Sequence, residues 1–212
     1  MLKMQSEMLL TASQFPAKSN DQPQRDRYCR LIVLRTSDLL GSASGFVRGA
    51  DIVAGQILMR SMLEDLIRVL WGTLSEENAQ HLVQHGQDEF KNVFRVNLQE
   101  GTARVTDTDG LDQSQRFLEE GTLKRVVKKK SVETMAKEAG ALGLYNVCYR
   151  FASLHTHGNF LDQPRTDDPI DISAMLSALG AISKATGHIC IRWLLGRERP
   201  SDTELLELLG VH

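Results

Sequence analysis

Apolar residues recur at steps of three and four along most of the chain, the spacing typical of amphipathic helices. The clearest run lies between Asp51 and Leu74 and predicts a helix of about six turns. Its apolar stripe consists of Ile52, Val53, Ile57, Leu58, Leu63, Leu66, Ile67, Leu70 and Trp71. A weaker run from Leu31 towards Phe46 indicates a helix before it.

The same periodicity, together with residues that favour helix ends, predicts the remaining helices. They are a helix after Ser75 that stops at Gly101, one capped by Ser131, one over 144–157, one over 170–195, and a short one with a capping box of Ser201 and Glu204. Strand patterns are nearly absent. The sequence therefore predicts an all-α protein, a bundle of four or more antiparallel helices with a short C-terminal helix.

Polar segments indicate the domain organisation. Residues 11–27 are polar and contain two prolines, so we expect residues 1–25 to form an arm that leads into the fold. Residues 26–212 then form a single domain. Residues 101–116 are polar and rich in turn formers, which predicts an exposed excursion between helices, with a short hairpin as an alternative.

Charge and cysteine content limit the classes of function. Lys plus Arg number 25 and Asp plus Glu 27, a net charge of −2, which argues against a protein that coats nucleic acids. The cysteines Cys29, Cys148 and Cys190 are odd in number and far apart, so we expect them to be reduced in a cytoplasmic protein. We expect no membrane association, because the chain shows neither a signal peptide nor an uncharged apolar run of about 18 residues.

The most informative segment runs from Leu144 to Asn159. In an ideal helix, Arg150 and His157 lie within about 20° of one line. Tyr149 and Ser153 join them in one polar stripe. A guanidinium can hold a phosphate while an imidazole moves protons, which suits phosphodiester chemistry. The structural alternative is that these residues cap or salt-bridge one end of the bundle.

A second candidate pair, Arg60 and Glu64, lies four residues apart inside the most apolar helix. The flanking residues are so apolar that both charges are expected to be partly buried and therefore paired. Alternatively, Glu64 orients Arg150 or His157 from a facing helix.

Two further clusters carry charge. The basic one comprises Lys124, Arg125, Lys128, Lys129 and Lys130. It is either a solvated face or the docking place for an RNA backbone.

The other cluster is a stripe of Glu77, His81, His85 and Glu89, spaced four residues apart. Two histidines at this spacing can chelate a metal, but no third ligand is implied, which favours a solvated helix face. We expect neither a metal nor a cofactor.

An arginine followed after four to six residues by a histidine, near a helix end, resembles the HEPN superfamily. Both His155 and His157 fit this spacing from Arg150. The resemblance extends to Leu58-Met-Arg-Ser-Met-Leu-Glu64 and to Tyr149-x3-Ser153-x3-His157-Gly158. Over roughly residues 28–195 the chain is similar to a bacterial HEPN-like family of unknown function that is often seen in mobile or phage-defence contexts.

This resemblance implies a dimeric, metal-independent ribonuclease. Arg150 would stabilise the phosphate, and His157, or its rival His155, would be the acid and base. Supporting positions would be Tyr149, Ser153, Arg60, Glu64 and Asn159. The implied partners are RNA, a second copy of the chain, and an antitoxin or defence-system protein.

One position departs from the resemblance. Many active members carry a polar residue directly after the arginine, where this chain has Phe151. The alternative is therefore a non-catalytic helical module that binds a nucleotide, an RNA or a partner protein.

The last predicted long helix bears on assembly. It is rich in small residues, which permit close helix approach either inside the bundle or against a second protomer. A two-fold arrangement would bring together two Arg150/His157 pairs, so the sequence predicts a homodimer.

Overall fold

The computed structural model describes residues 2–14, 22–48, 52–121, 123, 126–150, 169–196, 198 and 200–209. Its elements are α1 (Leu2–Ser13), α2 (Pro23–Arg48), α3 (Ile52–Gly72), α4 (Glu76–Gln99), α5 (Ser114–Glu119), α6 (Val132–Glu138), α7 (Leu142–Leu144), η1 (Tyr145–Tyr149), α9 (Pro169–Leu194) and α10 (Asp202–Leu209). These residues contain no strand, only an isolated antiparallel bridge between Thr106 and Asp112. The predicted all-α class and the short C-terminal helix are confirmed.

The chain forms two compact units, where the sequence indicated a single domain over 26–212. The first unit comprises residues 1–79 and 131–212, and the second comprises residues 80–130. The sequence pattern did not reveal this division, because hydrophobic periodicity reports which face of a helix is buried and not which helices it is buried against.

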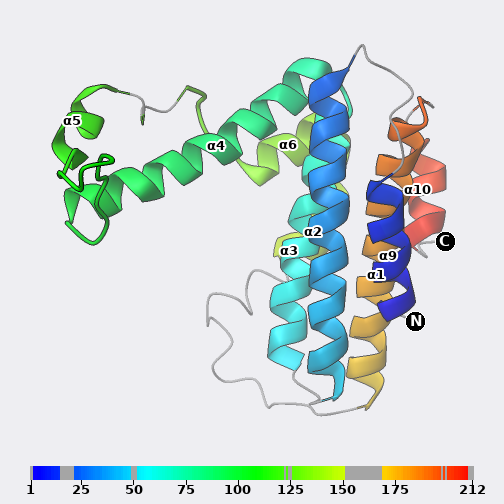
Figure 1. Ribbon diagram of the computed structural model, residues 1–212. Helices are drawn as coiled ribbons and strands as arrows, with labels where there is room; N and C mark the ends of the chain where they lie inside the picture. The colour runs from blue at the N-terminus through cyan, green and yellow to red at the C-terminus, as the bar shows by residue number, and fades with distance from the viewer. Residues whose placement is uncertain are drawn as a thin grey trace. The chain divides into compact units, whose positions relative to one another are not determined.

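In the first unit, α1, α2, α3 and α9 pack side by side (Figure 1). The C-terminal half of α3 is buried on most of its surface, since α2, α6, α9 and η1 all contact this helix. Its buried residues include Met62, Leu63, Leu66, Ile67, Val69, Leu70 and Trp71. This burial explains the dense run of apolar residues over α3 in the sequence.

The N-terminal residues have more regular structure than the sequence suggested. We expected residues 1–25 to form an arm, but Leu2–Ser13 form helix α1, which packs against α2 and α9. Leu9 and Ala12 are buried there. The Ser6 hydroxyl lies 2.9 Å from the Ser37 carbonyl, to which it donates a hydrogen bond. Polar contacts of this kind hold α1 in place although its sequence lacks a clear apolar stripe.

Helix α9 is the apolar centre of the first unit. By length and composition alone, its segment Ser173–Leu194 could cross a membrane, but half of that segment is buried inside the unit, as is typical of a core helix. Gly187 allows close approach, because a Cβ added there would lie 2.6 Å from Leu9 Cδ2 of α1. The absence of a side chain at Gly187 therefore serves packing within the bundle.

Three of the predicted N-terminal helix caps are present in the structure. The Ser75 hydroxyl accepts a hydrogen bond from the backbone N–H of Asn78 at the start of α4. The Ser131 side chain accepts a hydrogen bond from the Thr134 backbone N–H at the start of α6. At the start of α10, the backbone N–H of Ser201 donates to Glu204, and the backbone N–H of Glu204 donates to the Ser201 hydroxyl. This reciprocal pair is the predicted capping box. Cys29 and Cys190 are both buried, and no disulfide joins them.

The second unit contains most of α4 and the segment that follows it. The buried Asp88 carboxylate accepts hydrogen bonds from the backbone N–H groups of Val126 and Val127. These bonds, the one from Val127 first, hold the pKa of Asp88 below its ordinary value. Residues 101–113 form turns closed by the Thr106–Asp112 bridge, which fits the weak hairpin alternative for this region.

Candidate functional site

The candidate site begins with a break in regular helix geometry. In η1, the backbone N–H of Arg150 donates to the carbonyl of Tyr145, five residues earlier, in place of the four-residue step of an α-helix. Such π-helical turns are frequent at functional sites. Helix α3 contacts this turn, and Tyr149, its last residue, is buried.

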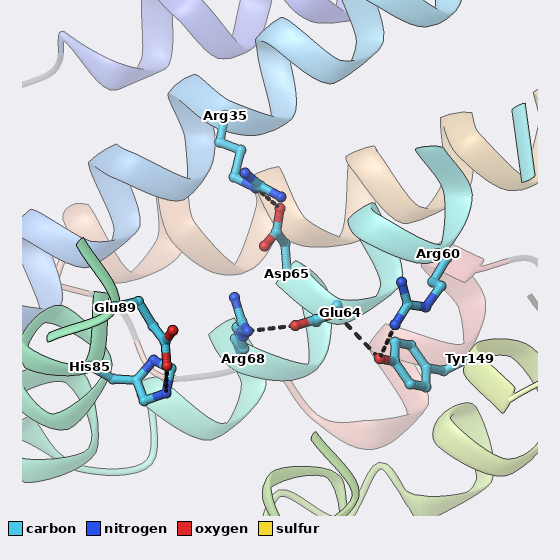
Figure 2. Close-up of polar contacts among 8 residues, drawn as sticks. All are labelled: Arg35, Arg60, Glu64, Asp65, Arg68, His85, Glu89 and Tyr149. Carbon is cyan, nitrogen blue, oxygen red and sulfur yellow. Dashed lines mark hydrogen bonds and ion pairs between the residues drawn. The ribbon is translucent and has the colours of Figure 1, made fainter. Parts of the chain in front are cut away.

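The Tyr149 hydroxyl joins two charged residues of α3 (Figure 2). It accepts a hydrogen bond from Arg60 Nη2 and donates one to Glu64 Oε2, each over 3.3 Å. The Arg60 guanidinium also lies 5.4 Å from the centre of the Tyr149 ring, a distance that permits a cation–π interaction. We call Arg60, Glu64 and Tyr149 the tyrosine network.

Burial raises the pKa of the Tyr149 phenol, and the negative charge of Glu64 raises it further, while Arg60 acts in the opposite direction. The phenol therefore keeps its proton at neutral pH. It acts as a hydrogen-bond donor to Glu64 and not as a base.

Glu64 forms its ion pair with Arg68, one turn further along α3. The sequence predicted a pair between Arg60 and Glu64, and the same four-residue spacing fits Arg68 equally well. In the structure, Arg60 and Glu64 are linked through the Tyr149 hydroxyl. Glu64 therefore contacts the residue directly before Arg150, and its orientation of Arg150 or His157 stays a prediction.

A second ion pair lies next to this network, between α3 and α2. The Asp65 carboxylate is almost completely buried, and Arg35 Nε donates to its Oδ2 over 2.6 Å (Figure 2). Burial raises the pKa of Asp65, while the Arg35 guanidinium acts to lower it. The pair of Arg35 and Asp65 links α2 to α3. The neighbouring carboxylate, Glu64, contacts Tyr149 instead.

The structure brings together three of the residues predicted from sequence, Arg60, Glu64 and Tyr149. Arg150 follows the network directly and its side chain is exposed to solvent. The remaining candidates of this segment lie outside the described residues; they are Ser153, His155, His157 and Asn159.

The predicted basic cluster belongs to the second unit. Lys128 and Lys129 are exposed and Lys130 is partly exposed, whereas Lys124 and Arg125 lie outside the described residues. The carbonyl of Lys128 lies 3.0 Å from His81 Nε2, so the backbone of this segment is tied to α4. The exposed lysine side chains fit both interpretations, a solvated face and an RNA contact.

Three residues of the stripe on α4, namely His81, His85 and Glu89, contact one another. His85 Nε2 lies 3.6 Å from Glu89 Oε1 (Figure 2), and the rings of His81 and His85 stack. Among the residues that the structure describes, no group of three or more His, Cys, Asp or Glu side chains could hold a metal.

Sequence reasoning missed two residues of the site, Arg68 and Tyr145. The Tyr145 ring stacks on that of Tyr149, with ring centres 5.2 Å apart and planes inclined by 21°. Both residues could have been found from their spacing. Arg68 lies four residues after Glu64, and Tyr145 lies four residues before Tyr149.

Comparison with known proteins places this site within a family. Residues 26–166, which include Arg60, Glu64, Tyr149 and Arg150, match the model described as "Family of unknown function (DUF5677)". No curated protein and no solved structure matches the chain.

Proposed function

The chain belongs to the DUF5677 family, and we propose that it is a HEPN-like, metal-independent endoribonuclease of toxin or antiphage-defence type, acting in the cytoplasm. One observation supports this most. The two segments that carry the resemblance, Leu58–Glu64 and the one that starts at Tyr149, are joined by the tyrosine network. Two motifs about 85 residues apart in sequence thus meet directly before the arginine that the proposal makes catalytic.

The proposed reaction is an internal transesterification of RNA. The 2′-hydroxyl attacks the adjacent phosphorus, the bond from phosphorus to the 5′-oxygen breaks, and a 2′,3′-cyclic phosphate forms. His157 takes the proton from the 2′-hydroxyl and returns it to the leaving oxygen, with His155 as the alternative. The exposed Arg150 guanidinium stabilises the negative charge on the phosphate in the transition state.

The direct test is to incubate the purified chain with single-stranded RNA, with and without EDTA. We expect cleavage at equal rates in both, and products that end in a cyclic phosphate. DNA of the same sequence should stay intact because it lacks the attacking 2′-hydroxyl. Cleavage abolished by EDTA, or of DNA as well as RNA, would contradict the proposed mechanism.

The proposal includes a homodimer, since one arginine and one histidine make an open site that a two-fold axis would complete. Sedimentation at micromolar concentration should give about twice the chain mass of 23.7 kDa. A stable monomer at this concentration would argue against a composite site. Cleavage by that monomer would then place the whole reaction in one chain.

A non-catalytic module that binds RNA, a nucleotide or an antitoxin-like partner is the second candidate. Phe151 favours it, because it stands directly after the proposed catalytic arginine, where many active HEPN members carry a polar residue. Expression in bacteria separates the two candidates. Growth arrest relieved by Arg150→Ala supports the ribonuclease, and harmless overexpression of soluble protein supports the module.

A further inference from the structure

The tyrosine network continues into a pair of stacked rings. The Arg60 guanidinium lies at the hydroxyl edge of Tyr149, 5.4 Å from the ring centre, and the ring of Tyr149 lies nearly parallel to that of Tyr145. Tyr149 is buried, whereas Tyr145 is partly exposed. Tyr145 is therefore the solvent-facing end of a stack that α3 holds from the inside.

The surface around Tyr145 is open. Leu142, Gly143 and Asn146 are all exposed. A Cβ added at Gly143 would meet no atom within 4 Å. The stack therefore reaches the surface where the described part of the chain leaves room for a ligand.

Arg150 lies one turn of the chain after Tyr145. The hydrogen bond from its backbone N–H to the carbonyl of Tyr145 places the two residues on successive turns of one short segment. An aromatic ring one turn before an exposed arginine offers a base-stacking surface together with a phosphate contact, the combination that proteins use to bind single-stranded nucleic acids.

We propose that Tyr145 stacks against a nucleobase of single-stranded RNA and so positions the neighbouring phosphate at Arg150. This inference rests on the proposed ribonuclease function and specifies its substrate as unpaired RNA. Tyr145 is a positioning residue in this scheme. The rigid support from Tyr149 and Arg60 reduces the conformational entropy that the ring loses when a base binds.

The test measures binding of a short RNA whose 2′-hydroxyls are methylated, so that it cannot be cleaved, by fluorescence anisotropy. Stacking is worth about 1–3 kcal/mol per base, so Tyr145→Leu should weaken binding about 5- to 150-fold. Tyr145→Trp should bind as tightly as the natural chain. Leu142→Ala, at an exposed neighbour, is the matched control and should change nothing.

An oligonucleotide of the same length without bases separates stacking from general damage. It should bind equally well to the natural chain and to Tyr145→Leu. The stacking role is wrong, while the ribonuclease proposal stands, in either of two outcomes. In the first, Tyr145→Leu binds normal RNA as tightly as the natural chain does. In the second, the substitution weakens binding of the base-free oligonucleotide as much as it weakens binding of normal RNA. If the natural chain neither binds nor cuts RNA, both proposals fail.

Discussion

Arg150→Ala is expected to lower the rate of RNA cleavage by at least about 100-fold, the range found when a group that stabilises transition-state charge is removed. The side chain is exposed and follows the tyrosine network, so its removal should not disturb the buried contacts of Tyr149. The rate is measured with purified proteins of equal concentration and matching circular dichroism. Arg27→Ala, at an exposed arginine on α2, is the matched control and should cleave normally.

His157→Ala should cause a comparable loss, because it removes the proposed acid and base. His155→Ala decides between the two histidines: a small effect assigns the role to His157, and a large effect from His155 alone reverses the assignment. Cleavage that survives in the double variant Arg150→Ala/His157→Ala would show that this pair is not the active site.

Arg35→Ala is expected to destabilise the first unit by about 2 kcal/mol at neutral pH, since it leaves the buried Asp65 carboxylate without its cation. This expected loss of stability is smaller than that for breaking a fully buried ion pair, because 55% of the Arg35 side chain is exposed. Urea unfolding followed by circular dichroism measures the change. Asp65→Asn in the same background should restore part of the lost stability, because the asparagine carries no charge.

The pH dependence of this variant follows from the Asp65 carboxyl. Its pKa is raised in the folded chain by burial, so the folded chain binds the proton more tightly than the unfolded chain does. The stability that this proton contributes is therefore present at low pH and is lost as the pH rises through the folded pKa. Arg35 acts to lower that pKa, so its removal raises it further. The destabilisation by Arg35→Ala should then shrink on acidification from pH 7 towards pH 5; a loss that stays constant would show that the ion pair is not its cause.

The main helices could be predicted because burial imposes a period on their sequences. The predicted bounds of α3, α4 and α9 agree with the structure to within a few residues. Helix α1 was not predicted from the sequence, because polar residues point into its packing interface. Gln5 and Ser6 interrupt its apolar pattern, yet Ser6 bonds to Ser37 of α2, and Gln5 accepts a hydrogen bond from Ser183 of α9. Periodicity cannot distinguish such residues from solvent-facing ones.

The site could be predicted only in part, for a geometric reason. The four-residue spacing indicated an ion pair between Arg60 and Glu64, whereas Glu64 pairs with Arg68 and is linked to Arg60 through Tyr149. This spacing could not show that the Tyr149 hydroxyl lies between the two charges, because this contact depends on how η1 meets α3. The π-helical turn itself has no marker in the sequence. Tyr145 was overlooked although it lies four residues before Tyr149, because the spacing alone does not show that the two rings stack.

The turn in η1 also has a consequence for how relatives should be aligned. It accommodates one residue more than an α-helical turn, so it is equivalent to a one-residue insertion in a helix. Deleting one residue between Tyr145 and Tyr149 would restore regular hydrogen bonding and leave Arg150 on nearly the same side of the helix, because this turn closes over five residues where an α-helix closes over four. A relative that lacks this residue would therefore still present its arginine beside α3. A gap within 145–149 is thus compatible with a retained arginine, although such a gap in a helix is usually treated as an alignment error.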